Sequence, residues 1–237
     1  MAGVPNEHLT GHHNPWRTVE HARQWIARMD REPRDRREEL GLLVALLPFE
    51  PSARIEVLEL GAGHGALTTM LLERFPRARV LAVDLSPVMV EEGQRRLKRF
   101  GERVRFLEWD LEQPGWPAQV DGAFDAVVSS LAIHHLNRSR KAELARQLYG
   151  RLRPGGVVLN LDYVSPGSES LRRRYEQAQP ALQAQHDQAG HGPNLAGSHA
   201  TDALFDQLDD LRQAGFQDVD VFWKLLGVAL FGGTRSA

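Results

Sequence analysis

A glycine-rich segment follows directly on a short apolar run in this sequence. Residues 57–68 read VLELGAGHGALT, in which Glu59 comes two positions before Gly61, and Gly63 follows. Because glycine has no Cβ and tolerates positive φ, such a turn lets a ligand come close to the main chain. The residues before the turn favour a strand and the apolar spacing after it favours a helix. We therefore expect a binding loop rather than a purely structural turn.

The spacing of the glycines and the charge beside them indicate what this loop binds. The dinucleotide fingerprint G-x-G-x-x-G delivers a pyrophosphate to a helix N-terminus, whereas here the third glycine comes one residue earlier. The carboxylate of Glu59 would repel a pyrophosphate but suits a ligand with a positive charge. S-adenosylmethionine fits this description, since it carries a sulfonium, an ammonium and no phosphate.

A second acidic side chain follows the next apolar run. Asp84, in VLAVDLS, stands where a ribose ligand needs a carboxylate to accept its hydroxyl protons, about 20 residues after the loop. An aspartate here could instead cap the helix that begins near Pro87, although Ser86 is also available for that task. We expect ribose binding.

Two consecutive histidines, His134 and His135, follow a later apolar run in FDAVVSSLAIHHL. Ligands of open α/β sheets bind at the carboxyl ends of the strands, where this pair is expected. A neutral imidazole can take a proton from a hydroxyl or amine near pH 7, so both histidines are candidate catalytic bases. The alternative is that one of them packs on the cofactor or bonds to a backbone carbonyl.

No metal site is predicted. The chain has no cysteine, which excludes disulfides, thiolate nucleophiles and cysteine-ligated metals. The other histidines lack the i, i+4 helical pairing with a helper glutamate that marks a zinc helix. They include His12, His13, His186, His191 and His199.

The elements that must position these residues alternate along the chain. Strands separated by helices of this length predict a parallel, doubly wound α/β sheet. We expect strands at 54–60, 79–84, 103–108, 123–129 and 156–162, and helices at 64–74, 87–100 and 138–152.

Both ends of the chain depart from this alternation. A mobile arm over 1–17 and helices at 18–30 and 33–47 are expected first, with Thr18 as a cap. After the alternation come a polar insertion with a helix near 168–188, a helix at 201–214, and a hairpin of strands 217–222 and 225–231 with Trp223 and Lys224 between them.

The composition is that of an ordinary globular protein. The 237 residues predict one large domain or two small ones, and a formal net charge of −2 gives no basic surplus for nucleic acid or a membrane surface. The N-terminus has no signal-peptide pattern, and no apolar run approaches the ~20 residues that span a bilayer. We expect a cytoplasmic protein.

Five segments occur in order between residues 55 and 163: VLELGAGHG, VLAVDLS, FLEWDLEQP, FDAVVSSLAIHHL and LRPGGVVLNLDYV. With them the chain resembles the class I S-adenosylmethionine-dependent methyltransferases, although His64 replaces the Thr, Cys or Ser more usual in the glycine loop. The resemblance implies a Rossmann-like sheet of about seven strands in the order 3-2-1-4-5-7-6, with the last strand antiparallel.

The resemblance also implies roles for individual cofactor-binding residues. It implies that the methionine end of the cofactor is lined by Glu59, Gly61 and Gly63. It implies that the ribose and adenine contact Asp84, Leu85, Asp110, which receives the adenine amino group, and Leu111. Ser130 and Leu131 are implied to lie beside the sulfonium.

The expected activity is methyl transfer to a small molecule by in-line displacement, with S-adenosylmethionine as cofactor. Methylation of protein or RNA, a nicotinamide-dependent oxidoreductase and a non-catalytic cofactor-binding module are the alternatives, and the oligomeric state stays open. Residues 1–50 are expected to form the arm and lid helices, 51–237 the methyltransferase domain, and 165–200 an insertion over the active site.

Overall fold

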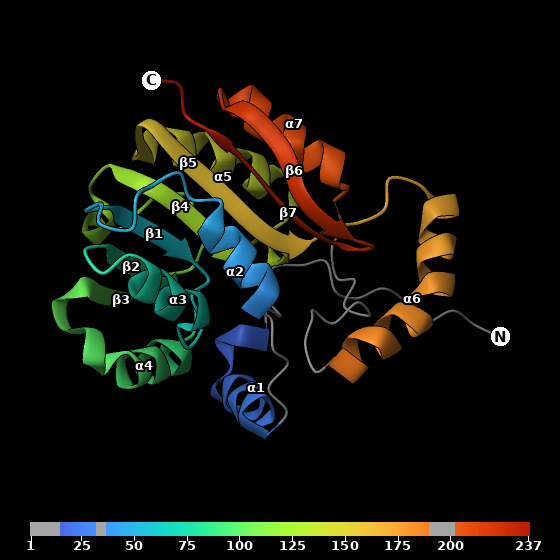
Figure 1. Cartoon of the computed structure of the whole chain (residues 1–237), viewed down its shortest axis with the longest axis horizontal. Helices are drawn as coiled ribbons and strands as arrows, with labels where there is room; N and C mark the ends of the chain where they lie inside the picture. The colour runs from blue at the N-terminus through green and yellow to red at the C-terminus, as the bar shows by residue number, and fades with distance from the viewer. Residues whose placement is uncertain (1–14, 32–36, 190–201) are drawn as a thin grey trace.

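A seven-stranded sheet forms the centre of the molecule in the computed structural model, which describes residues 15–31, 37–189 and 202–237 (Figure 1). The strands lie in the order β3-β2-β1-β4-β5-β7-β6, which confirms the expected topology. The parallel strands are β1 (Glu56–Leu60), β2 (Arg79–Asp84), β3 (Val104–Glu108), β4 (Phe124–Ser130) and β5 (Leu152–Tyr163). β7 (Val228–Thr234) runs antiparallel to both β5 and β6 (Gln217–Leu225).

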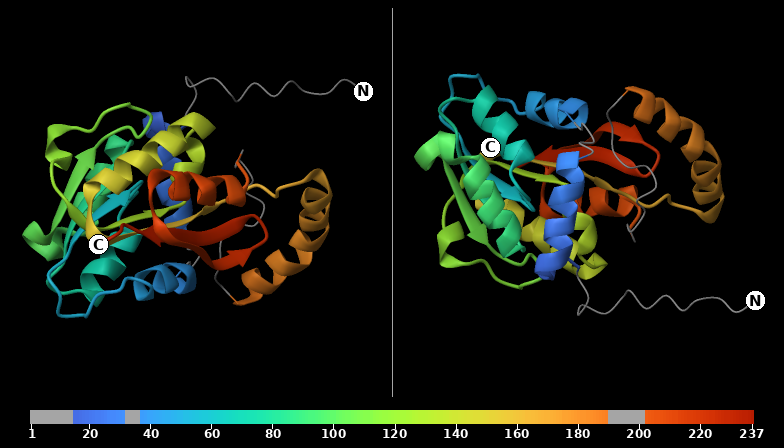
Figure 2. Two further views of the ribbon diagram at one scale, coloured as in Figure 1. Left: turned by 90° about the horizontal axis from the view of Figure 1, so that it is seen from above. Right: turned by 90° about the horizontal axis from the view of Figure 1, so that it is seen from below.

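Helices cover both faces of the sheet, so the central strands are apolar on both sides (Figure 2). α2 (Arg37–Ala45) and α3 (Ala66–Arg74) pack on one face, and α5 (Arg138–Arg151) and α7 (Leu204–Ala214) pack on the other. The direction in which the strands are added reverses between β1 and β4. Ligands of doubly wound sheets bind outside the carboxyl ends of such strands.

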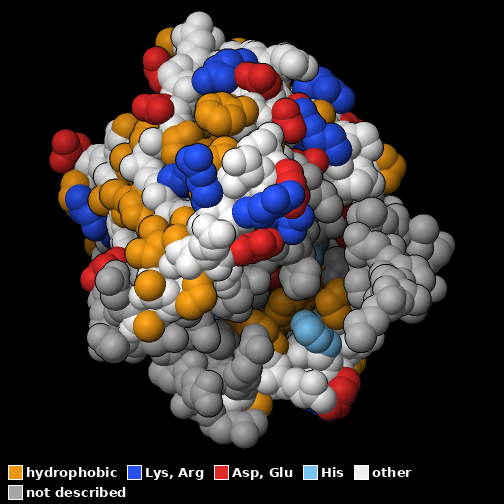
Figure 3. Space-filling view, turned by 90° about the vertical axis from the view of Figure 1, so that its right-hand side faces the viewer, with side chains coloured by type: hydrophobic (Ala, Val, Ile, Leu, Met, Phe, Trp, Pro, Cys, Tyr) orange, Lys and Arg blue, Asp and Glu red, His pale blue; other side chains and the backbone are white. Residues whose placement is uncertain are grey.

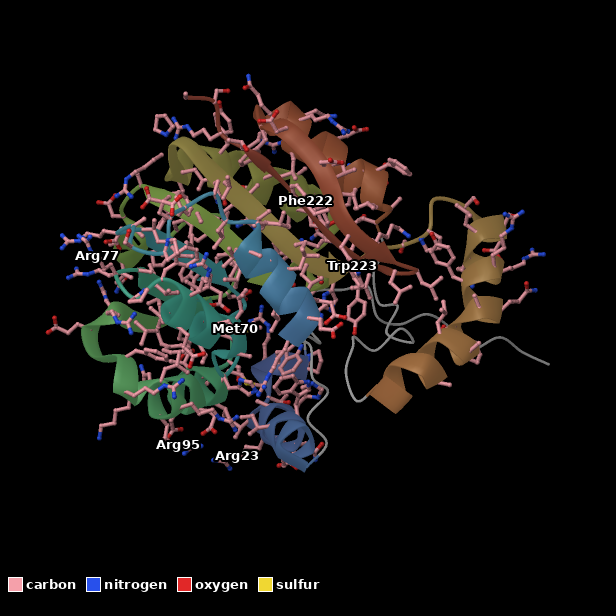
Figure 4. All side chains as sticks on the ribbon, viewed as in Figure 1. Arg23, Met70, Arg77, Arg95, Phe222 and Trp223 are labelled. Carbon is pink, nitrogen blue, oxygen red and sulfur yellow. The ribbon has the colours of Figure 1, made fainter. Side chains whose placement is uncertain are left out.

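The expected elements are present with shifted ends. The helix expected at 87–100 is α4 (Pro87–Arg96), followed by the 3-10 segment Lys98–Arg103, in which Gly101 has φ 57° and interrupts the helical geometry. β6 is longer than expected and β7 begins later than expected, so placing Trp223 and Lys224 between the two strands was wrong. Both lie within β6 and pair with β7, and Trp223 packs against the core on the α2 side (Figure 4). Burial of the indole extends the strand.

The N-terminal segment begins with the 3-10 turn η1 (Pro15–Arg17) and continues as α1 (Val19–Arg31). The Thr18 hydroxyl accepts a hydrogen bond from the backbone N–H of His21 at 3.4 Å, which confirms the expected cap. Residues 1–14 of the predicted mobile arm lie outside the described residues. Its last three residues are ordered as η1 against the sheet edge, so the arm prediction was wrong there, because aromatic and ionic contacts hold them.

The insertion before the last hairpin is closed at its base. The backbone N–H of Ser165 donates to the carbonyl of Asp202 at 2.9 Å, and the buried Lys141 ammonium lies 2.5 Å from the Asp202 carboxylate. Between these ends α6 (Glu169–Ala189) stands away from the sheet (Figures 1 and 2). Among the residues described, no helix is long and apolar enough to cross a membrane.

Candidate active site

The glycine loop joins β1 to α3 at the carboxyl edge of the sheet. Gly61 has φ 66°, and a Cβ there would lie 2.1 Å from the Cβ of Ala132. Gly63 has φ 55°, but a Cβ there would meet nothing within 4 Å. Gly61 is therefore required by packing, whereas the Gly63 backbone borders open space that a ligand can enter.

Glu59 ends up fully enclosed near the carboxyl end of β1. Its carboxyl accepts a hydrogen bond from the Thr68 hydroxyl at 2.5 Å. Burial raises the pKa of Glu59 to about 8; the Thr68 hydrogen bond opposes this shift, and the nearby charge of Asp84 adds to it. The side chain is therefore largely protonated at neutral pH, and a cation bound beside it would favour loss of that proton.

Asp84 ties the glycine loop to the start of α4. One carboxylate oxygen accepts from the backbone N–H of Gly63 at 2.7 Å and the other from that of Ser86 at 2.9 Å. Burial raises the pKa of Asp84, and these two hydrogen bonds oppose the shift. Ser86, not Asp84, is the N-cap residue of α4. Each oxygen keeps lone-pair capacity for a hydroxyl donor.

Asp110 and Leu111 follow β3. One oxygen of Asp110 accepts from the backbone N–H of Glu112 at 2.9 Å, and the other accepts from the Arg17 guanidinium. The same guanidinium lies 3.2 Å from the Glu112 carboxylate. The Leu111 carbonyl accepts from Arg140 at 2.6 Å. Sequence reasoning missed Arg17, because a contact with a residue 93 positions away leaves no local pattern.

Ser130 and Leu131 lie at the end of β4, as expected. Leu131 has φ 52°, and its N–H donates to the Leu161 carbonyl at 2.8 Å. A non-glycine residue rarely adopts this conformation outside sites where the surroundings impose it. The chain therefore turns sharply off β4 and leads directly into the histidine pair.

His134 is buried and held by Asp162, the penultimate residue of β5. Its ring Nδ1 lies 2.6 Å from one carboxylate oxygen of Asp162, and its backbone N–H donates to the other at 2.9 Å. The Asp162 side chain is fully buried and also accepts from the N–H of Tyr163. A carboxylate at Nδ1 keeps the proton on that nitrogen, which leaves the lone pair on Nε2. Asp162 was not predicted; its signal was a charged residue inside an apolar strand.

His135 is half-buried and contacts the N-terminal segment. Its Nε2 lies 3.0 Å from the indole nitrogen of Trp16, and since an indole N–H only donates, that Nε2 is an acceptor. The Trp16 ring also packs edge-on against Trp25, whose ring lies 5.4 Å from that of His64 in the glycine loop. Neither tryptophan was predicted to reach the site. Figure 3 shows a histidine side chain beside hydrophobic side chains on one face of the molecule.

No group of three or more His, Asp or Glu side chains that could hold a metal ion occurs in the described part of the chain. Of the other histidines, those at 12, 13, 191 and 199 lie outside the described residues.

Comparison with known proteins relates the central part of this chain to methyltransferases. Residues 57–156 match the model of a methyltransferase domain. The chain is 37% identical over 110 residues to a demethylmenaquinone methyltransferase of Thermus thermophilus, a match that covers 46% of this chain and 48% of the relative. It is 35% identical over 117 residues to a trans-aconitate 2-methyltransferase of Deinococcus radiodurans, covering 49% and 40%. The chain spans less than half the length of these curated relatives.

Solved structures share the fold over more of the chain. An O-methyltransferase family protein from Burkholderia thailandensis superposes with a TM-score of 0.65 at 22% identity, covering 94% of this chain and 62% of the other. Human N-acetylserotonin methyltransferase in complex with S-adenosylmethionine gives a TM-score of 0.62 at 17% identity, covering 94% and 58%. Residues 57–156 thus resemble a methyltransferase domain, and the chain shares the fold of these solved structures, one of which is a complex with S-adenosylmethionine.

The residues of the site fit this cofactor. The backbone at Gly63 borders open space, and a buried carboxyl, Glu59, lies where a positive charge can be stabilised. Asp84 has remaining acceptor capacity beside the loop.

Proposed function

We propose that this protein methylates a hydroxyl or amine group of a small-molecule acceptor. The observation that carries the proposal is that the glycine loop and an imidazole with its lone pair on Nε2 meet at the carboxyl ends of β1 and β4. When bound, S-adenosylmethionine supplies an electrophilic methyl group. In an in-line displacement the acceptor atom would bond to the methyl carbon as the carbon–sulfur bond breaks, and His134 Nε2 would take the acceptor's proton.

In this proposal His134 acts as the base and Asp162 is a positioning residue that fixes the imidazole. The separation of 2.6 Å between Nδ1 and the carboxylate supports this role. His135 is the alternative base, but in this structure its Nε2 already accepts from Trp16.

The cofactor contacts follow the strand ends. Glu59, Gly61 and Gly63 would surround the methionine portion, and Asp84 would accept from the ribose hydroxyls. Leu85, Asp110 and Leu111 would hold the adenine, and Ser130 and Leu131 would lie beside the sulfonium.

We assign the acceptor side to two segments outside the common fold. The N-terminal helices of 1–50 act as a lid on the domain of 51–237, which the contacts of Trp16 and Trp25 support. The insertion at 165–200 completes the acceptor site; closed loops of this kind exclude water and set specificity. The cytoplasmic location stays a prediction.

The acceptor is a small molecule rather than protein or nucleic acid. The relatives named above are, by name, methyltransferases of demethylmenaquinone and trans-aconitate, and a net charge of −2 does not favour a polyanion.

The experiment is methyl transfer from labelled cofactor into a host extract that is afterwards separated into small-molecule, protein and nucleic-acid fractions. We expect label in the small-molecule fraction with the wild-type protein, and far less with His134→Ala. Label in RNA alone, with a binding affinity that falls steeply with salt, would contradict the proposal.

A further inference from the structure

Two consecutive residues of η1 reach two different parts of the site. The Arg17 guanidinium pairs with Asp110 after β3, and the Trp16 indole N–H donates to His135 Nε2 after β4 at 3.0 Å. Residues 16 and 17 share one 3-10 turn, which Thr18 fixes by donating its hydroxyl to the Pro15 carbonyl at 2.8 Å. Because both side chains extend from this one short turn, a shift of the turn moves both together.

Arg17 occupies a carboxylate that the proposed function needs for the cofactor. Asp110 is there the acceptor of the adenine amino group, and one of its oxygens is already paired with the guanidinium. Arg17 pairs with a second carboxylate as well, because that of Glu112 lies 3.2 Å from the same nitrogen. Its side chain is 40% exposed, so it can exchange partners without entering the protein core.

Trp16 contacts the acceptor side of the proposed site, as Arg17 contacts the cofactor side. Its N–H engages the lone pair of His135 Nε2, and the rings of His135 and His134 lie 4.0 Å apart. The indole therefore lies against the histidine pair on which the proposed acceptor site is built, while Arg17 lies on Asp110.

We propose that Trp16 and Arg17 form a two-ended latch that makes binding ordered, with the cofactor before the acceptor. Adenine at Asp110 displaces Arg17 toward Glu112, the turn of η1 shifts, and Trp16 leaves His135. This inference rests on the proposed function, since it takes Asp110 as a cofactor contact. It adds that the acceptor side opens only when the cofactor side is filled.

The test measures access to His135 without knowledge of the acceptor. Diethyl pyrocarbonate modifies deprotonated imidazole nitrogens, and fragment-ion mass spectrometry separates modification at residues 134 and 135. We expect slow modification of His135 in the ligand-free full-length protein and faster modification when S-adenosylhomocysteine is added. An unchanged or slower rate on saturation with S-adenosylhomocysteine would overturn the latch and identify η1 as a lid that closes on the ligand.

A variant separates the two ends of the latch. Arg17→Ala should expose His135 to the reagent without any ligand, and should raise the affinity for S-adenosylhomocysteine by roughly two- to five-fold, the range that one exposed ion pair can supply. This difference from wild type should shrink at high ionic strength. The matched control is Arg23→Ala, an exposed arginine on the outer side of α1 (Figure 4), which should behave as wild type. Equal rates in Arg17→Ala and wild type would contradict the coupling.

Failure of the latch and failure of the proposed function give different results. If S-adenosylhomocysteine shows no binding by calorimetry, the proposed cofactor site is wrong, and the latch falls with it. If it binds and His135 reactivity stays that of the ligand-free protein, only the latch is wrong. Trp16→Phe is an independent readout: it keeps a ring but removes the N–H donor, so the ligand-free protein should already show fast modification of His135.

Discussion

The proposed cofactor half of the site is formed around Glu59, Gly63 and Asp84, and the proposed acceptor half around His134 and His135. Both lie at the same edge of one sheet, but they are assembled differently. In the cofactor half, hydrogen bonds join residues close in the chain: Asp84 is 21 positions from Gly63, and Glu59 is 9 from Thr68. In the acceptor half, His134 is 28 positions from Asp162, and His135 is 119 from Trp16. Apart from the pair formed by Arg17 and Asp110, the proposed cofactor half is therefore held by short-range contacts around the glycine loop, whereas the proposed acceptor half also depends on the N-terminal segment that only the fold brings to it.

Removal of Asp84 should affect the cofactor half alone and give the largest effect. We expect Asp84→Ala to weaken S-adenosylhomocysteine binding by about 3–6 kcal/mol, because two hydrogen bonds to a charged acceptor are lost at ~1.5–3 kcal/mol each. Isothermal calorimetry measures this loss. Asp84→Asn is the matched control, which keeps the shape and one acceptor and should lose less. Unchanged affinity in the alanine variant would reduce Asp84 to a structural tie between the loop and α4.

Removal of His134 should affect the acceptor half alone. His134→Ala should lower turnover of the acceptor identified from the extract by roughly 10²–10⁴-fold, the usual contribution of a general base. Its affinity for S-adenosylhomocysteine should stay within about tenfold of wild type. His135→Ala is the matched control, one position along the chain. A larger loss of turnover in that control would move the base to His135, and a loss of affinity alone in both would make them packing residues.

The pH dependence of stability tests Glu59 in the cofactor half. Burial raises its pKa from 4.5 to about 8, so the folded state binds a proton that the unfolded state releases above pH 4.5. The contribution of this bound proton to the free energy of unfolding is fully present below pH 4.5 and is lost as the pH rises toward 8. The loss amounts to a few kcal/mol, since one pKa unit corresponds to about 1.4 kcal/mol.

Thermal unfolding of the ligand-free protein between pH 5 and pH 8 measures this loss. Glu59→Gln should flatten the dependence, whereas Glu56→Gln, at the start of the same strand, should keep it. A wild-type protein whose stability rises over this range would show that Glu59 is ionised in the fold.

The smallest effect probes the place where the two halves touch. Gly61→Ala puts a Cβ against Ala132, which precedes the histidine pair, and should destabilise the protein by about 1–3 kcal/mol. In Gly63→Ala the added Cβ meets no neighbour, so only the left-handed backbone conformation lowers the free energy of unfolding, by roughly 1 kcal/mol. Denaturant unfolding compares the two variants. Equal losses in both would mean that the loop does not pack against the acceptor half.

The sequence alone predicted the fold and the position of the glycine loop. The strand order and the glycine loop follow from local patterns, because apolar periodicity and glycine spacing are visible within a short window. Asp162, Trp16 and Arg17 were missed, since each acts through a partner that is distant in the chain. Trp223 was misplaced because its burial against α2 depends on tertiary packing, which outweighs local strand preference.

The two ends of the insertion are fixed to each other, so the length of the segment between them can change. Ser165 and Asp202 meet at 2.9 Å, and Lys141 anchors the second of them to α5, so the two ends stay fixed whatever lies between them. The entropy cost of closing a loop grows only by about 0.6 kcal/mol for each doubling of its length. The segment between these ends can therefore change in length at little entropic cost, and such a change would also remove the hydrogen bond that Lys224 of β6 donates to the Tyr175 hydroxyl of α6 at 2.8 Å.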